Sequence, residues 1–253
     1  ARCRPPWHQM SDSRPTPDPG DHPTGAPVEE RARHILGYAI LAPSSHNSQP
    51  WAFAVDGDEV WVYADESRAL SVADPDGREL ALSVGCAVEN LVVAAERFGL
   101  RTRVAYVDDP ADATAVDALC HVATVRLGPD EPSADPALCD AIRTRRTNHR
   151  PFEDRPVPAA VRERFADCPC GSDVGLAFVD DPERRRAIAG LQARADERQF
   201  ENRAYRAELV EWVGRGALGA NWLAARIGEA AVRRMVLGDR AGAPQAAPPA
   251  GLP

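Results

Sequence analysis

The spacing of apolar residues predicts helices and short strands along the first half of the chain. Apolar side chains recur every three or four positions in residues 28–42 and, most clearly, in residues 78–98, which is typical of helices packed on one face. Short apolar runs indicate strands, and Asp56, Gly57 and Asp58 form a hairpin signal. We expect strands at residues 51–55, 59–63, 101–107 and 121–127. This order of elements predicts an α+β fold built in layers.

The rest of the chain predicts further helices and fewer strands. We expect helices at residues 137–145, 181–200, 204–213 and 222–237, and a strand at residues 174–179. The two ends carry almost no apolar periodicity. Residues 1–27 contain seven prolines, and residues 241–253 consist mainly of Ala, Pro and Gly. We expect both ends to be disordered.

Composition and charge narrow the classes of function. The 253 residues are 44% hydrophobic, which is enough for a sizeable core. The net charge of -8 argues against a nucleic-acid partner, and no apolar run is long enough to predict a membrane span. All 30 basic residues are arginine, which excludes a lysine Schiff base. Scattered cysteines indicate free thiols in a cytoplasmic protein, and no cluster has the spacing of a metal site.

A polar loop follows the first predicted helix. It runs Pro-Ser-Ser-His-Asn-Ser-Gln-Pro from residue 43 to residue 50. The side chains of Ser44, Ser45, Asn47 and Gln49 can donate to or accept from a phosphate or the edge of a heterocycle. The alternative interpretation is a helix-end turn with ordinary serine and asparagine capping. The residues of the loop alone leave both interpretations open.

An arginine-rich segment lies about a hundred residues later. Residues 141–155 hold five arginines and two acidic residues, so this stretch is locally basic in an acidic chain. Arg145, Arg146 and Arg150, together with Thr147, could grip a phosphate through forked N–H groups and a hydroxyl. The alternative is a solvated run of surface charge, or a surface that binds acidic partners. The histidines of the two segments, His46 and His149, are expected to be hydrogen-bonded surface residues.

Together these segments resemble the nitroreductase-like FMN-binding superfamily. The resemblance rests on Ala-Pro-Ser-Ser-His-Asn-Ser-Gln-Pro-Trp at residues 42–51 and Arg-Arg-Thr-Asn-His-Arg-Pro-Phe at residues 145–152. Simpler members carry the arginine motif before the serine motif. The inverted order here is similar to the Acg-like, actinobacterial branch, in which one chain holds two nitroreductase-like halves. Residues 74–80, 83–91 and 207–212 also resemble that branch.

The resemblance implies a layered α+β fold with a central mixed sheet flanked by helices. It implies a first half at residues 28–142 and a second half at residues 143–240. The second half is shorter than the pattern of the branch, so we expect it to be incomplete and the chain to be C-terminally truncated. The twin-half pattern implies a monomer that imitates a dimer, or a homodimer.

The resemblance also implies an activity. It makes the chain an FMN-dependent oxidoreductase that passes electrons from NAD(P)H to a nitro compound, a quinone or a similar small acceptor. The flavin carries the chemistry, so no side chain is expected to be catalytic. The cofactor-binding residues implied are Ser44, Ser45, Asn47, Gln49, Arg145, Arg146, Thr147 and Arg150. The alternatives are a non-catalytic protein that sequesters FMN under stress, or an inactive fragment of one.

Overall fold

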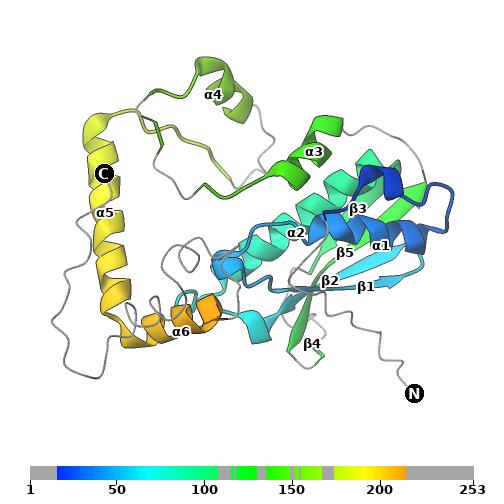
Figure 1. The fold of residues 1–253 in the computed structure, drawn as a ribbon, viewed down its shortest axis with the longest axis horizontal. Coiled ribbons are helices and arrows are strands. Elements are labelled where there is room, and N and C mark those ends of the chain that lie inside the picture. Colours follow the sequence, from blue (N-terminus) through cyan, green and yellow to red (C-terminus); the bar gives the residue numbers. More distant parts are fainter. Residues whose placement is uncertain are drawn as a thin grey trace. The chain divides into compact units, whose positions relative to one another are not determined.

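In the computed structural model, residues 51–129 contribute the strands of one antiparallel sheet (Figure 1). The structure describes residues 16–107, 115–116, 118–129, 135–148, 152–153, 155–166 and 174–214. The strands are β1 (Trp51–Asp56), β2 (Glu59–Asp65), β3 (Leu100–Tyr106), β4 (Ala115–Val116) and β5 (Leu119–Pro129). They are ordered β1-β2-β5-β3, and β4 pairs with β5.

The first hairpin follows directly from its sequence. Gly57 has a φ of +59°, which glycine adopts without strain, and it closes the tight turn between β1 and β2. Along β2, alternate residues Val60, Val62 and Ala64 are buried. Val62 lies opposite Ala123 of β5, whose alternate residues are buried as well. The pairing therefore places one apolar face of the sheet toward the core.

Two helices cover that apolar face (Figure 1). They are α1 (Val28–Ala39) and α2 (Arg78–Arg97), and they pack on each other as well as on the sheet. The core between these layers includes Ile35, Val88 and Leu91, each at most 2% exposed. Helix α2 is followed by Gly99, whose φ of +73° suits a helix end. The expected helices and strands of this region are thus confirmed, with ends shifted by a few residues.

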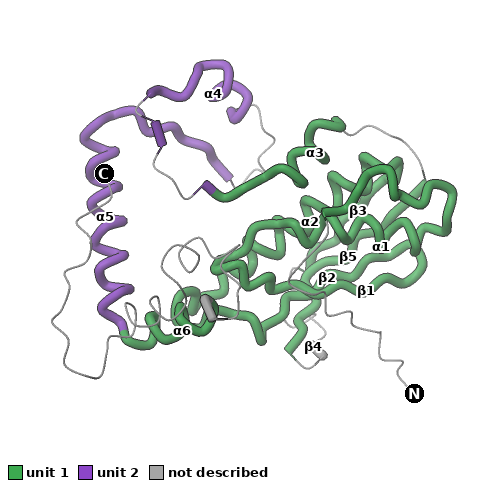
Figure 2. Tube along the Cα trace, in the orientation of Figure 1, with its two compact units in different colours: residues 1–147, 203–238 green, residues 148–202, 239–253 purple. Residues whose placement is uncertain are grey.

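The chain divides into two compact units, shown in different colours in Figure 2. The first unit comprises residues 1–147 and 203–238 and includes α3 (Pro136–Thr144) and α6 (Arg203–Gly214). The second comprises residues 148–202 and 239–253 and includes α4 (Ala159–Ala166) and α5 (Pro182–Glu201). Within the second unit, Arg162 of α4 pairs with Asp180 at 2.7 Å and stacks over the ring of Phe178.

The α+β class is confirmed, and three expectations about detail change. All strand pairs among the described residues are antiparallel, so the parallel pairing of a mixed sheet is not among them. Residues 174–179 are exposed and form no strand, because no described strand pairs with them. Helix α4 was not expected, since its apolar residues show little periodicity. The expected helix at residues 222–237 lies outside the described residues.

Part of the segment expected to be disordered is ordered. Residues 16–27 include a short 3-10 helix at Pro19–Asp21. His22 stacks on Phe98, at the end of α2, with ring centroids 4.1 Å apart. Arg31 of α1 donates to His22 at 3.4 Å. The expectation of disorder was therefore wrong for residues 16–27, because a contact distant in sequence holds them.

The division into a first half at residues 28–142 and an incomplete second half at residues 143–240 stays a prediction. Residues 241–253 lie outside the described part of the chain.

Candidate functional site

The polar loop after α1 has an unusual backbone. It contains a 3-10 turn, η2 (Ser45–Asn47), and three non-glycine residues with positive φ: His46 at 52°, Asn47 at 53° and Gln49 at 54°. Each such conformation costs about 1–2 kcal/mol for an L-residue. Short-range hydrogen bonds hold the loop in this form: Gln49 N–H donates to Ser44 Oγ at 2.9 Å, and Asn47 N–H donates to the Ser44 carbonyl at 2.9 Å. The loop is therefore preorganised and strained.

Two of the loop's hydroxyls already have partners inside the protein. Ser44 Oγ accepts the Gln49 N–H, and the Ser45 hydroxyl donates to Glu79 Oε2 of α2 at 2.8 Å. The capping interpretation is thus partly correct, because both serines shape the loop. It does not account for Gln49 Oε1 and His46 Nε2, which are buried and have no hydrogen-bond partner among the described residues. Such orphaned atoms are rare unless a ligand or water completes them.

A small cavity lies beneath the loop. Its volume is about 10 Å³, which is room for about one water molecule. Ser48, which is 2% exposed, forms part of its wall, and Arg68 donates to the Ser48 carbonyl at 3.0 Å. The further lining residues are Ser45, Pro50, Ala69, Leu70, Asp74, Glu79, Leu80 and Ser83. Pockets for drug-sized ligands measure about 300–1,000 Å³, so this cavity is too small for a nucleotide.

The arginine segment begins beside this loop. Arg145, just after α3, donates from Nη2 to the carbonyl of Leu41 at 3.2 Å, and from Nη1 to Thr147 Oγ1 at 3.3 Å. Leu41 stands two residues before Pro43, where the polar loop starts. The next residue, Arg146, donates to the carbonyls of Arg143 and Arg145. One hydrogen bond therefore joins two segments that are 104 residues apart in sequence.

The predicted site residues thus fall into two groups with different exposure. Ser44, Ser45, Asn47 and Gln49 are half-buried in the loop, whereas Arg145, Arg146 and Thr147 are exposed. Arg150 and His149 lie outside the described residues. Exposed guanidinium groups suit a phosphate that remains partly solvated, and half-buried amides suit a flat ring.

Sequence reasoning missed the residues that support the loop. Glu79 and Arg68 contact it directly. Helix α6 contacts η2, and its Glu208 accepts the backbone N–H groups of Val72 and Ala73. Residues 207–212, which include Glu208, entered the sequence analysis only through the family resemblance. The local sequence does not indicate which distant groups Glu208 contacts.

The histidine of the loop is expected to be neutral at pH 7. Burial lowers the pKa of His46 below its ordinary value, and the negative charge of Glu208 opposes this shift only in part. A neutral imidazole has no need of a counter-ion, which is consistent with its unpartnered Nε2 atom.

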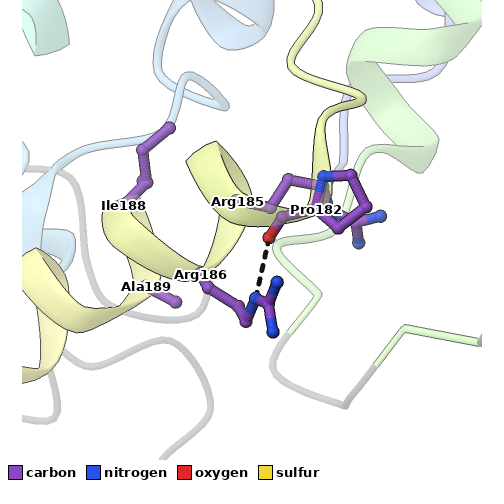
Figure 3. Close-up of a pocket in the computed structure, with 5 residues that line it drawn as sticks. All are labelled: Pro182, Arg185, Arg186, Ile188 and Ala189. Carbon is purple, nitrogen blue, oxygen red and sulfur yellow. Dashed lines mark hydrogen bonds between the residues drawn. The ribbon is translucent and has the colours of Figure 1, made fainter.

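An open hollow lies away from this loop, on helix α5 (Figure 3). Its five lining residues, Pro182, Arg185, Arg186, Ile188 and Ala189, all belong to the first turns of that one helix. Arg186 turns back and donates from Nε to the Pro182 carbonyl at 3.2 Å. A hollow lined by one helix encloses no ligand, and none of the predicted site residues lines it.

The described residues contain no group of three or more His, Cys, Asp or Glu side chains that could hold a metal ion. Among the same residues, no helix is long and apolar enough to cross a bilayer.

The chain is similar to several mycobacterial proteins. It is 36% identical over 193 residues to a Mycobacterium tuberculosis protein named "Putative NAD(P)H nitroreductase Rv3131", a match that covers 76% of this chain and 54% of the relative. It is 28% identical over 178 residues to "Putative NAD(P)H nitroreductase acg" from the same species, covering 70% and 52%. The chain thus spans about half the length of the curated relatives it matches.

Solved structures give weaker matches, and no family model matches the chain. A crystal structure described as a "Putative NADH Oxidase" from Clostridium acetobutylicum has a TM-score of 0.35 and 18% identity, covering 44% of this chain and 82% of that one. A nitroreductase family protein from Streptococcus pneumoniae has a TM-score of 0.31 and 19% identity, covering 50% and 86%. Over the residues that it shares with these mycobacterial relatives, the chain is similar to proteins named putative NAD(P)H nitroreductases, among them Acg.

Proposed function

We propose that the chain binds FMN and forms part of an oxidoreductase that passes electrons from NAD(P)H to a small acceptor, such as a nitro compound or a quinone. The names of its relatives support a nicotinamide donor and a redox reaction. The observation that carries the proposal is the hydrogen bond from Arg145 to the Leu41 carbonyl. Through this bond, the exposed arginine segment begins beside the preorganised polar loop. A phosphorylated flavin requires both features, namely cations for its phosphate and polar groups for its ring.

The residues present fit FMN in their chemistry. The phosphate is a dianion, and Arg145, Arg146 and Thr147 offer it guanidinium N–H groups and a hydroxyl beside one another. We assign Arg150 to the same group. At the loop, Gln49 Oε1 is a buried acceptor without a partner in the described part of the chain, which suits an N–H group on the edge of a ring. We assign Ser44, Ser45 and Asn47 to the ring edge and the ribityl chain.

The role of these side chains is to bind and orient. When bound, FMN supplies the redox chemistry. The arginines neutralise the phosphate, and the strained loop fixes its donors and acceptors before the ligand arrives, so they lose little freedom on binding. Neutral His46 leaves the loop without added charge at pH 7. No side chain is required as a nucleophile. We further propose one FMN per chain, a cytoplasmic protein, and either a monomer that imitates a dimer or a homodimer.

The phosphate assignment is tested with two ligands that differ only in the phosphate. Arg146→Ala is expected to weaken FMN binding about tenfold and riboflavin binding little, because a charge-assisted hydrogen bond at an exposed site is worth about 1.5 kcal/mol. Arg155→Ala is the matched control, since Arg155 is exposed in the same segment and pairs with Glu153 at 2.8 Å. Affinity is measured by quenching of flavin fluorescence. Equal losses for both ligands would refute the assignment.

Reduction of the bound flavin distinguishes an oxidoreductase from a protein that only stores FMN. With FMN bound and excess NADH or NADPH added, loss of the oxidised flavin's visible absorption supports the oxidoreductase. A flavin that stays oxidised favours the sequestering protein. A wild-type chain that binds no FMN contradicts the proposal as a whole.

A further inference from the structure

We propose that Glu208 of α6 is a positioning residue for the polar loop. It fixes residues 71–73, and through them it sets the contact between Ser45 and α2. The assignment of this loop to FMN rests on the proposed function, whereas the contacts that link Glu208 to it do not.

The first step is the anchor itself. Glu208 Oε2 accepts the Ala73 N–H at 2.9 Å, and Oε1 accepts the Val72 N–H at 3.1 Å and the Ser71 hydroxyl at 3.4 Å. One turn further along α6, Trp212 is 6% exposed and packs on Leu70, which is 4% exposed. The helix therefore holds this segment by a carboxylate and by an apolar contact. Hydrogen bonds to an ionised acceptor are roughly twice as strong as neutral ones.

The second step leads from the anchored segment into α2. The Asp74 N–H donates to the Leu70 carbonyl at 2.7 Å, which closes the turn that Glu208 holds. Asp74 Oδ2 accepts the Leu80 N–H at 2.9 Å, so Asp74 fixes the first turn of α2. Glu79 lies in that turn and accepts the Ser45 hydroxyl. Residues of all three segments line the same small cavity. A displacement at residues 72–73 is thus transmitted to Ser45 through a continuous series of hydrogen bonds by way of Asp74 and Glu79.

A carboxylate is needed at this position. Its two oxygens serve two neighbouring backbone N–H groups at once. Glutamine keeps one acceptor oxygen and points an NH₂ group at the other backbone donor, so it preserves half of the anchor at most. Alanine leaves both N–H groups without their protein acceptor and removes the hydrogen-bonded link between α6 and the turn, so that only the apolar contact of Trp212 with Leu70 remains.

The experiment compares Glu208→Ala, Glu208→Gln and the control Glu89→Ala, whose glutamate is exposed on α2. Hydrogen exchange is measured on the full chain, together with binding of FMN and riboflavin. In Glu208→Ala we expect protection of the Val72 and Ala73 amides to fall about tenfold or more. We expect exchange at Ser48 and Gln49 to rise, with an intermediate effect for glutamine and none for the control. FMN and riboflavin should weaken by the same factor, because the loop is assigned to the ring edge and the ribityl chain.

A double-mutant cycle with Ser45→Ala tests the path. If Glu208 acts through Ser45, its replacement should cost less flavin affinity when Ser45 is already alanine. Fully additive losses overturn the proposal, as does unchanged exchange at Ser48 and Gln49 when Val72 and Ala73 lose protection. If the wild-type chain binds no flavin, the proposed function fails and exchange alone decides the proposal. If the alanine variant does not fold, the glutamine variant is judged by the same criteria.

Discussion

Replacement of Gln49 separates the stability of the polar loop from its proposed function. Gln49 has a φ of +54° and carries a buried side-chain oxygen without a partner among the described residues. Both features are unfavourable for folding. Gln49→Ala removes the side chain and keeps the Cβ atom, whereas Gln49→Gly removes the backbone strain as well. The two variants together isolate the strain.

The magnitudes follow from these two features. Loss of a buried, unsatisfied polar atom relieves about 1–3 kcal/mol, partly offset by lost packing of the side-chain stem. A positive φ costs an L-residue about 1–2 kcal/mol, and Gln49→Gly relieves this cost. Glycine also gives the unfolded chain more conformational freedom, which lowers the free energy of unfolding by about 0.5–1 kcal/mol. The free energy of unfolding of Gln49→Gly is therefore expected to exceed that of Gln49→Ala by about 0.5–1 kcal/mol. Both variants should lose flavin affinity to the same degree, because both lack the acceptor oxygen.

Urea unfolding and flavin titration measure the two effects in the same samples. We expect Gln49→Gly to unfold at a higher urea concentration than Gln49→Ala. We expect both variants to bind flavin equally, and more weakly than the wild type. Alanine as stable as glycine would refute the strain argument. Flavin binding equal to that of the wild type in both variants would refute the role assigned to Gln49 Oε1.

Two further predictions concern the first unit outside the loop. Leu91→Ala should lower the free energy of unfolding by about 2–5 kcal/mol in urea titrations, because Leu91 is fully buried between the helices and the sheet; a loss below about 1 kcal/mol would show that this core is loosely packed. Burial, then repulsion by His34 and Arg31, lowers the pKa of His22 from 6.5 to about 4. The unfolded chain therefore takes up a proton before the folded one as pH falls from 6.5 toward 4, and stability should decline across that window. His22→Phe should make the unfolding midpoint less sensitive to pH there, and an unchanged slope would contradict the assignment to His22.

Local pattern was a good guide where an element has one buried face. The spacing in residues 78–98 predicted α2, and the hairpin signal predicted the turn between β1 and β2. The pattern failed for residues 174–179, which are apolar enough for a strand yet have no described strand beside them. A strand needs partners for its backbone N–H and C=O groups, and those partners lie on other segments.

The sequence by itself determined the described helices other than α4, the hairpin, the α+β class and the two polar segments that resemble a flavin site. Each of these depends on residue type and short-range spacing. Only the tertiary structure decided which groups meet. It joins Arg145 to the Leu41 carbonyl, His22 to Phe98, and Glu208 to the turn at residues 72–73. These contacts link residues 76 or more positions apart. They form only after packing of the helices on the sheet has brought their segments together, so no local pattern encodes them.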